Sequence, residues 1–312
     1  MAAPAPVRPD EAPLAEGIAR YVELFRQQQP AETLAGMRLS GDLGASRFAE
    51  SGDRLETFDT AIALPGREVA VRVHAPDGEG PHPTICYFHG GGFSHGSTAS
   101  FDVASHALAR ASGAQVVSIQ YRRLPDSDFA AAQEDCDAAF AWLARNAALL
   151  GADPARLVLA GDSVGALFAL NCALANRGQG IQPNALLLFY GAFALRRQDD
   201  AYHGAGDPLL GPDRIAAFVN LYARCGGPRP ALDRPDLGGL PPVHLVAAQH
   251  DPLAVDSVWL AEALGAAGVK VGLRVAPGMI HGFLRAVALS PPVREELRLA
   301  ADAVRQDMQG AG

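Results

Sequence analysis

The sequence lacks the features that suit a nucleic-acid-binding or membrane protein. It has no basic run, and 26 lysines and arginines stand against 34 aspartates and glutamates, for a formal net charge of −8. That charge repels phosphate backbones and anionic lipid surfaces, so neither a nucleic acid nor a membrane is expected as a partner, and a small-molecule substrate is favoured. No apolar run reaches the roughly 20 residues that a membrane-spanning helix needs.

Signals for export and for metal binding are missing as well. The N-terminus is rich in alanine and proline but has no charged start followed by an apolar core, which predicts a cytoplasmic, soluble protein. The four cysteines form no Cys-x-x-Cys pair, and we interpret them as reduced packing residues without a metal site. They are Cys86, Cys136, Cys172 and Cys225.

Short apolar runs alternate with helix-length segments through most of the 312 residues. This alternation predicts an α/β fold in which parallel strands are joined by right-handed crossovers, with helices on both faces of the sheet. The runs at residues 55–64 and 68–74 alternate apolar and polar side chains, so these two are expected to be antiparallel edge strands. The expected buried strands are residues 84–88, 115–121, 157–160, 185–190, 243–248 and 269–275.

Two segments interrupt this pattern and define the expected domain organisation. Residues 192–240 are rich in glycine, proline and charged side chains and follow a strand end, which favours an insertion over a functional site rather than a bare loop. Residues 1–52 contain an amphipathic helix from Pro13 onward, followed by a Gly- and Ser-rich stretch that is either a lid segment or an arm. The core then comprises residues 53–191 and 241–312.

The chain is organised around Leu-Val-Leu-Ala-Gly-Asp-Ser-Val-Gly at residues 157–165, which runs into a long apolar segment. An apolar run, Gly-x-Ser-x-Gly and a second apolar run are typical of a buried strand, a sharp turn and a buried helix. Ser163 would lie at the turn, where glycine on both sides avoids collisions with neighbouring backbone. The helix N-terminus beside it favours a nucleophile that generates an anion. A simple Gly/Ser turn before a helix is the alternative.

A serine nucleophile needs a base, and the base needs a carboxylate that fixes its tautomer. His281 directly follows the last predicted strand, and Asp251 follows the strand before it. The carboxyl ends of parallel strands meet at one edge of a sheet, so we predict that Ser163, Asp251 and His281 form a catalytic triad. Asp256, about one helical turn further on, is the competing acid and is expected to face away or to support the start of a helix instead.

A glycine run supplies the third part of the expected site. His-Gly-Gly-Gly-Phe at residues 89–93 follows a buried strand, and consecutive glycines let backbone N–H groups point inward without a side chain in the way. We predict an oxyanion hole formed by the N–H groups of Gly91, Gly92 and Val164. The alternatives are a flexible loop and a phosphate cradle, and the second is disfavoured because no Gly-Lys-Ser or Gly-Lys-Thr follows.

Five motifs in this order closely resemble the hormone-sensitive-lipase-like branch, the bacterial family IV esterases, of the α/β-hydrolase superfamily. They are residues 89–93, 121–126, 161–165, 251–253 and 281–283. Within this branch, residues 190–196 look most like bacterial acetyl esterases. The resemblance implies an eight-stranded, mostly parallel sheet flanked by helices, under a helical cap built from the N-terminal residues and the insertion. It also implies ester hydrolysis without a cofactor.

The resemblance extends to the substrate pocket and to assembly. His89, Phe93 and Phe283 are expected to contact the substrate, and the last strand leaves room for a homodimer paired edge to edge. Two positions depart from the family pattern. Val164 stands where the family usually has alanine, and its extra methyl groups are expected to narrow the acyl pocket. Asp126 stands where the family usually has glutamate, which puts the family's supporting hydrogen bonds in doubt.

Together, these observations predict a carboxylesterase that acts on short acyl esters through an acyl-enzyme intermediate. An amidase or arylformamidase would use the same site, and assays of matched esters and amides would separate them. A non-catalytic ligand-binding receptor on the same scaffold is the third alternative. Such receptors typically lose the base, whereas this chain keeps all three members of the predicted triad.

Overall fold

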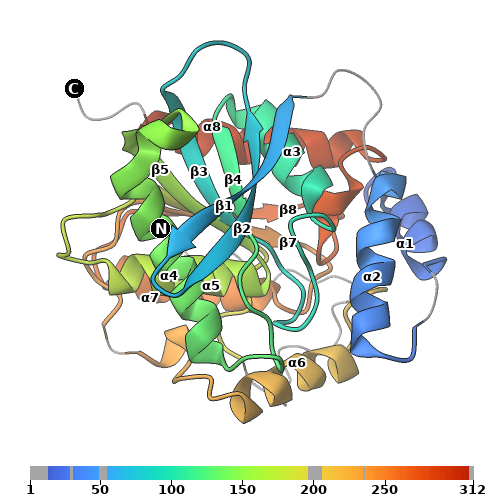
Figure 1. The fold of residues 1–312 in the computed structure, drawn as a ribbon. Helices are drawn as coiled ribbons and strands as arrows, with labels where there is room; N and C mark the ends of the chain where they lie inside the picture. Colours follow the sequence, from blue (N-terminus) through green and yellow to red (C-terminus); the bar gives the residue numbers. More distant parts are fainter. Residues whose placement is uncertain (1–12, 29–30, 49–54, 196–205, 235, 309–312) are drawn as a thin grey trace.

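The computed structural model describes residues 13–28, 31–48, 55–195, 206–234 and 236–308. Its centre is an eight-stranded sheet in the order β1-β2-β4-β3-β5-β6-β7-β8 (Figure 1). The strands are β1 Glu56–Leu64, β2 Arg67–Ala75, β3 His82–Phe88, β4 Gln115–Ile119, β5 Ala152–Asp162, β6 Ala185–Phe189, β7 Val243–Ala248 and β8 Val271–Ala276. The β1–β2 and β2–β4 pairs are antiparallel and the other neighbours are parallel, which confirms the predicted fold class.

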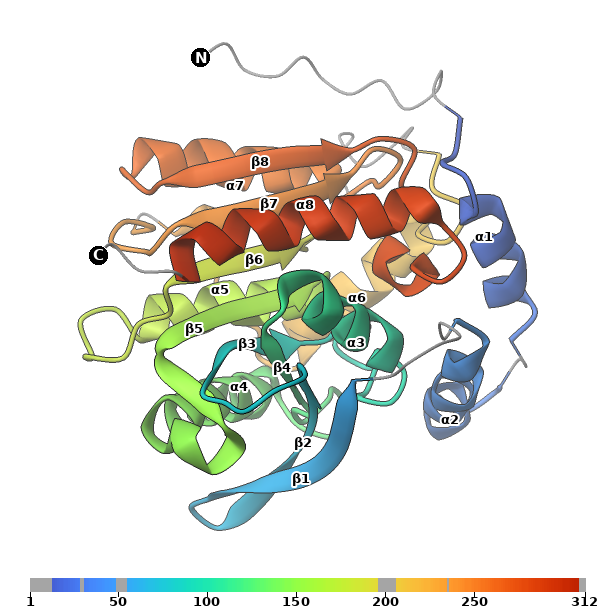
Figure 2. The ribbon, with the colours of Figure 1, turned by 90° about the horizontal axis from the view of Figure 1, so that it is seen from above.

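Helices cover both faces of the sheet (Figure 2). One face carries α3 Asp102–Ser112 and α8 Pro291–Met308, and the other carries α4 Phe129–Asn146, α5 Val164–Ala175 and α7 Ala254–Ala266. Successive side chains of a strand point to opposite faces, so a strand that is apolar throughout supplies both layers. In β5, Leu159 packs in the layer with α5, whereas Val158 and Ala160 pack in the layer with α3 and α8.

Three further helices lie beyond the carboxyl ends of the parallel strands (Figures 1 and 2). They are α1 Ile18–Arg26, α2 Leu34–Gly44 and α6 Pro212–Arg224. The sequence pattern did not predict α2, because its glycines lower helix propensity. The Thr33 side chain caps this helix by accepting a hydrogen bond of 3.1 Å from the Gly36 N–H.

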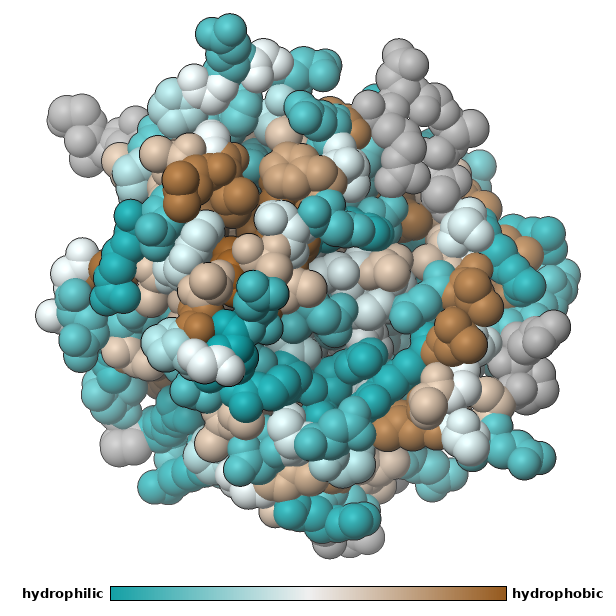
Figure 3. Space-filling model, viewed as in Figure 1, coloured by the Kyte–Doolittle hydropathy of each residue, from teal (hydrophilic) through white to brown (hydrophobic). Residues whose placement is uncertain are grey.

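All four cysteines are free, and Cys86, Cys136 and Cys172 are buried, as predicted for packing residues. Within the described ranges, no helix combines the length and the apolar character needed to cross a bilayer. Exposed apolar side chains do gather on α2, where Leu39 and Leu43 are 58% and 70% exposed. Figure 3 shows them as a brown patch over this helix.

Candidate active site

Ser163 occupies the sharp turn between β5 and α5. Its backbone has φ 54° and ψ −121°, a conformation that non-glycine residues rarely adopt and that holds the side chain out of both elements. A Cβ on Gly165 would lie 2.0 Å from the Phe88 carbonyl oxygen, and one on Gly161 would lie 2.4 Å from the Gly165 oxygen. Both glycines are therefore required by close backbone packing around the turn.

The side chains of Asp251, His281 and Ser163 form one hydrogen-bonded chain. Asp251 follows β7 and His281 follows β8, so the register of the parallel sheet brings both to the edge where β5 ends. His281 Nδ1 lies 2.7 Å from Asp251 Oδ2, and His281 Nε2 lies 2.9 Å from Ser163 Oγ. An ionised carboxylate only accepts hydrogen bonds, so Nδ1 carries the proton and Nε2 is free to accept one from the serine.

The environment of His281 sets its protonation. Burial lowers the pKa of His281, but the charge and hydrogen bond of Asp251, together with the charges of Asp207 and Asp162, outweigh burial, so the pKa lies above its ordinary value. The Asp251 side chain itself is fully buried. A buried carboxylate in this position stabilises the imidazolium form that a base passes through.

Asp256, the competing acid, has a different partner. Its side chain is fully buried, and Oδ2 accepts hydrogen bonds from the backbone N–H groups of Phe193 and Ala194 at 2.7 and 2.8 Å. Those residues follow β6, so Asp256 fixes the chain where it leaves the sheet. The structure therefore brings Asp251, and not Asp256, into hydrogen-bond contact with His281.

The glycine loop is anchored to the turn by Asp162. Its Oδ1 accepts hydrogen bonds from the Gly90 N–H at 2.8 Å and the Tyr87 hydroxyl at 2.6 Å. Burial raises the pKa of Asp162 to about 6, although both hydrogen bonds act in the opposite direction. This arrangement holds the following residues, Gly91 with φ 123° and Gly92 with φ 57°, beside Ser163.

Three backbone N–H groups near Ser163 remain available to a ligand. Those of Gly91, Gly92 and Val164 donate no hydrogen bond to any residue in the part of the chain that the structure describes. A Cβ on Gly91 would lie 2.3 Å from the His95 carbonyl oxygen, so this backbone path also depends on glycine. Unpaired donors beside a nucleophile are what an oxyanion requires.

The three residues expected to contact substrate lie behind the cavity wall. His89, Phe93 and Phe283 are fully buried and are not among the residues that line the cavity. His89 stacks on Tyr121 with ring centroids 4.4 Å apart, and burial lowers the pKa of His89 to about 4. The Val164 side chain is also fully buried in the core and does not line the cavity, so it does not narrow the cavity directly.

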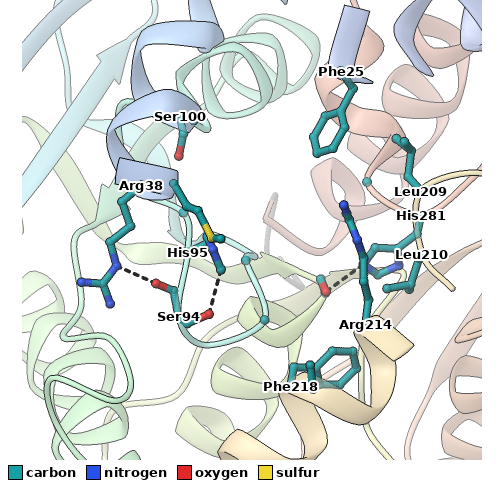
Figure 4. Close-up of a pocket in the computed structure, with 18 of the residues that line it drawn as sticks. Phe25, Arg38, Ser94, His95, Ser100, Leu209, Leu210, Arg214, Phe218 and His281 are labelled. Carbon is teal, nitrogen blue, oxygen red and sulfur yellow. Dashed lines mark hydrogen bonds between the residues drawn. The ribbon is translucent and has the colours of Figure 1, made fainter. Parts of the chain in front are cut away.

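A cavity of about 1570 Å³ opens above Ser163. Its walls come from α1 and α2, the glycine loop, the segment around α6, and the loop that carries His281 (Figure 4). The insertion and the N-terminal helices therefore face the site, as far as residues 192–240 and 1–52 are described. In the same described ranges, no group of three or more His, Cys, Asp and Glu side chains is arranged to hold a metal ion.

Asp207 is a residue of the site that sequence reasoning did not single out. Its Oδ2 accepts a hydrogen bond of 2.6 Å from the His281 backbone N–H, and its Oδ1 accepts bonds of 2.7 and 2.8 Å from Leu209 and Leu210. Burial raises the pKa of Asp207, and the Asp251 charge raises it further. Asp207 thus joins the insertion to the His281 loop. An aspartate before Pro-Leu-Leu in a segment expected to cover the site is the only signal that could have indicated it.

Arg38 connects α2 to the glycine loop. Its guanidinium donates to the Ser94 carbonyl at 2.7 Å and to the Leu124 carbonyl at 3.2 Å, and it also pairs with Asp126. The shorter acid at position 126 is thus engaged by the N-terminal segment. Figure 4 shows Arg38 and Ser94 on the opposite side of the cavity from His281.

The fold is a mostly parallel eight-stranded sheet with a serine on a strained strand-to-helix turn after β5. An aspartate after β7 and a histidine after β8 complete a hydrogen-bonded chain with this serine. These features define an α/β-hydrolase. A family model described as the alpha/beta hydrolase fold matches residues 85–285. The chain belongs to this family, within its hormone-sensitive-lipase-like esterase branch.

Individual relatives agree with this assignment. The chain is 35% identical over 245 residues to carboxylesterase NlhH of Mycobacterium tuberculosis. This alignment covers 73% of this chain and 75% of the relative. It is 32% identical to an ethyl acetate hydrolase of Pseudomonas putida, over 93% of this chain and 98% of that one. A hyperthermophilic esterase from Pyrobaculum calidifontis superposes with a TM-score of 0.84 at 27% identity, over 94% of this chain and 98% of that chain.

Proposed function

We propose that the protein is a serine carboxylesterase that hydrolyses short-chain acyl esters. The observation that carries this proposal is the continuous hydrogen-bonded chain from Asp251 through His281 to Ser163. His281 Nε2 takes the Ser163 proton as Oγ attacks the ester carbonyl, and Asp251 stabilises the resulting imidazolium. His281 then protonates the leaving alcohol, and water repeats the sequence on the acyl-enzyme.

The oxyanion of each tetrahedral intermediate is bound by the N–H groups of Gly91, Gly92 and Val164. Support comes from their unpaired state among the described residues and from the hydrogen bonds that fix Gly90 to Asp162. Losing one such donor typically costs about 3–4 kcal/mol in the transition state. As part of the same proposal, segments 1–52 and 192–240 form a cap whose described parts close the cavity over Ser163.

The short-acyl preference is supported by the relative named ethyl acetate hydrolase. The test is hydrolysis of p-nitrophenyl esters from acetate to dodecanoate, with Ser163→Ala as the control. We expect rates that peak between acetate and butyrate and vanish in the variant, while its circular dichroism spectrum stays native. A peak at eight carbons or longer contradicts the acyl preference. Activity that survives Ser163→Ala, or faster cleavage of the matched amides, contradicts the proposed reaction.

A further inference from the structure

The cavity is rich in cationic side chains although the whole chain is acidic. Among the described residues, five arginines and three aspartates line it, and neither lysine nor glutamate does. The carboxylates of Asp162 and Asp207 already accept hydrogen bonds from protein donors. The cavity therefore offers more positive charge to a ligand than the net charge of −8 suggests. The arginines are Arg26, Arg38, Arg214, Arg224 and Arg285.

Arg285 is held in the cavity wall without a counterion among the described residues. It follows His281 in a short 3-10 helix, and its guanidinium carbon lies 5.2–5.7 Å from the ring centroids of Phe25, Phe48 and Phe101. Its Nη2 is buried and has no hydrogen-bond partner in the described ranges. In the described part of the chain, its guanidinium makes neither a hydrogen bond nor an ion pair, and the Asp162 carboxylate of the same cavity is bonded to Tyr87 and Gly90 instead.

The buried guanidinium N–H groups of Arg285 on Nη2 lack an acceptor among the described residues, which destabilises the protein when no ligand is bound. A buried donor without an acceptor loses its hydration and gains nothing in return. Three aromatic faces offset part of this cost through cation–π contacts, yet they cannot accept the in-plane N–H groups. The planar fork of arginine matches a carboxylate, which accepts two parallel hydrogen bonds.

A second guanidinium approaches the same end of the cavity from the cap. Arg214 lies on α6, its side chain is exposed to the cavity, and it forms no ion pair with a described residue. Figure 4 shows this side chain extending from α6 past His281 toward Phe25, one of the rings that surround Arg285. The core and the cap thus each supply to the cavity that contains Ser163 one cation that forms no ion pair with a described residue.

We propose that Arg285 and Arg214 form a carboxylate-binding subsite, so that the preferred substrates are esters that carry a carboxylate a few bonds from the scissile group. This inference rests on the proposed esterase function and names its substrate class. The carboxylate belongs either to the acyl part, as in a hemiester of a short dicarboxylic acid, or to the alcohol part, as in the acetyl ester of a hydroxy acid. Both present the same anion to the two guanidinium groups.

The test compares matched neutral and anionic esters. On the acyl side, kcat/KM is measured for p-nitrophenyl butyrate and p-nitrophenyl hemiglutarate; on the alcohol side, for phenyl acetate and 3-acetoxybenzoate. We expect at least one anionic ester to exceed its neutral partner about tenfold, and Arg285→Met to lower that ratio about tenfold, to near one. Arg285→Lys keeps the charge but loses the two-donor fork, and should retain only part of the preference. Arg298→Met, a charge loss on the exposed face of α8, should leave the ratio unchanged.

The outcomes separate this subsite from the esterase proposal. Ratios near one for both pairs, or a ratio that neither Arg285→Met nor Arg214→Met changes, overturn the subsite. If Arg285→Met fails to fold, Arg214→Met decides, because the Arg214 side chain is exposed and makes no hydrogen bond or ion pair with a described residue. If the wild type cleaves none of the four esters, the esterase proposal fails. Calorimetry of Ser163→Ala with monomethyl and dimethyl glutarate then judges the subsite alone: tighter binding of the monoester supports it, and equal binding refutes it.

Discussion

Asp207→Asn tests how the insertion positions the proposed base. The carboxylate Oδ2 accepts the His281 N–H at 2.6 Å, while Oδ1 holds Leu209 and Leu210. Asparagine keeps one acceptor oxygen but turns an NH2 group toward the His281 N–H or toward the Leu209 and Leu210 N–H groups, so two donors face each other. A hydrogen bond to a charged group contributes about 1.5–3 kcal/mol, so we expect kcat/KM at its plateau to fall about tenfold or more.

The assay is the pH profile of kcat/KM. The base must be neutral, and the pKa of His281 is raised, so wild-type activity should fall as the pH drops through a value above about 6.5. Burial opposes this elevation, Asp251 contributes most to it and Asp207 adds to it. Removing the Asp207 charge therefore lowers the pKa of His281, and the acid limb should move to lower pH.

Asp213→Asn is the matched control. Asp213 lies in the first turn of α6 and lines the same cavity, but within the described part of the chain its side chain makes no hydrogen bond or ion pair with the His281 loop. Its removal takes the same charge from the same segment and should leave the acid limb in place. An acid limb that stays at the wild-type position in Asp207→Asn, or that moves equally in Asp213→Asn, would refute the reasoning.

Two predictions concern stability. Gly165→Ala should lower the free energy of unfolding by about 3 kcal/mol or more, because its Cβ would lie 2.0 Å from the Phe88 carbonyl oxygen. Gly41→Ala is the control: position 41 has open space in α2, so this change should leave the free energy of unfolding unchanged or raise it slightly. Equal unfolding midpoints of the two variants in urea would contradict the packing argument. Asp256→Ala should cost about 2–5 kcal/mol, because it leaves the Phe193 and Ala194 N–H groups buried without an acceptor. Asp256→Asn keeps an acceptor oxygen and should lose less, so an equally large loss in thermal melts would count against that account.

The sheet was predictable because its signals are local. A fully buried parallel strand must be apolar on both faces, which makes residues 157–160 and 185–190 recognisable without their neighbours. The Ser163 turn was predictable for a similar reason, since close backbone packing permits only glycine at positions 161 and 165. Chain order then placed Asp251 and His281 after consecutive strands, and the parallel register brought them to the same edge.

The sequence does not show on which side of the cavity wall the expected substrate-contacting side chains lie. His89, Phe93 and Phe283 lie beside motif residues, but adjacency along the chain does not determine which side of a wall a side chain faces. The structure turns all three into the core. The sequence pattern does not predict helix α2, because the helix is stabilised by the Thr33 cap and by the hydrogen bond from Arg38 to the Ser94 carbonyl. Neither contact produces a periodic pattern of apolar residues.

The sequence by itself determined the chain order of the strands, the strained serine turn and the placement of Asp251 and His281 after consecutive strands, because each depends on short-range sterics or on strand ends that a parallel sheet must bring together. Only the tertiary structure decided that Asp207 supports the His281 loop and that Arg285 lies in the cavity wall with its Nη2 unpaired among the described residues. Both depend on contacts between segments far apart in the chain. Such contacts follow from how the cap segments pack on the core, and no local pattern encodes that packing.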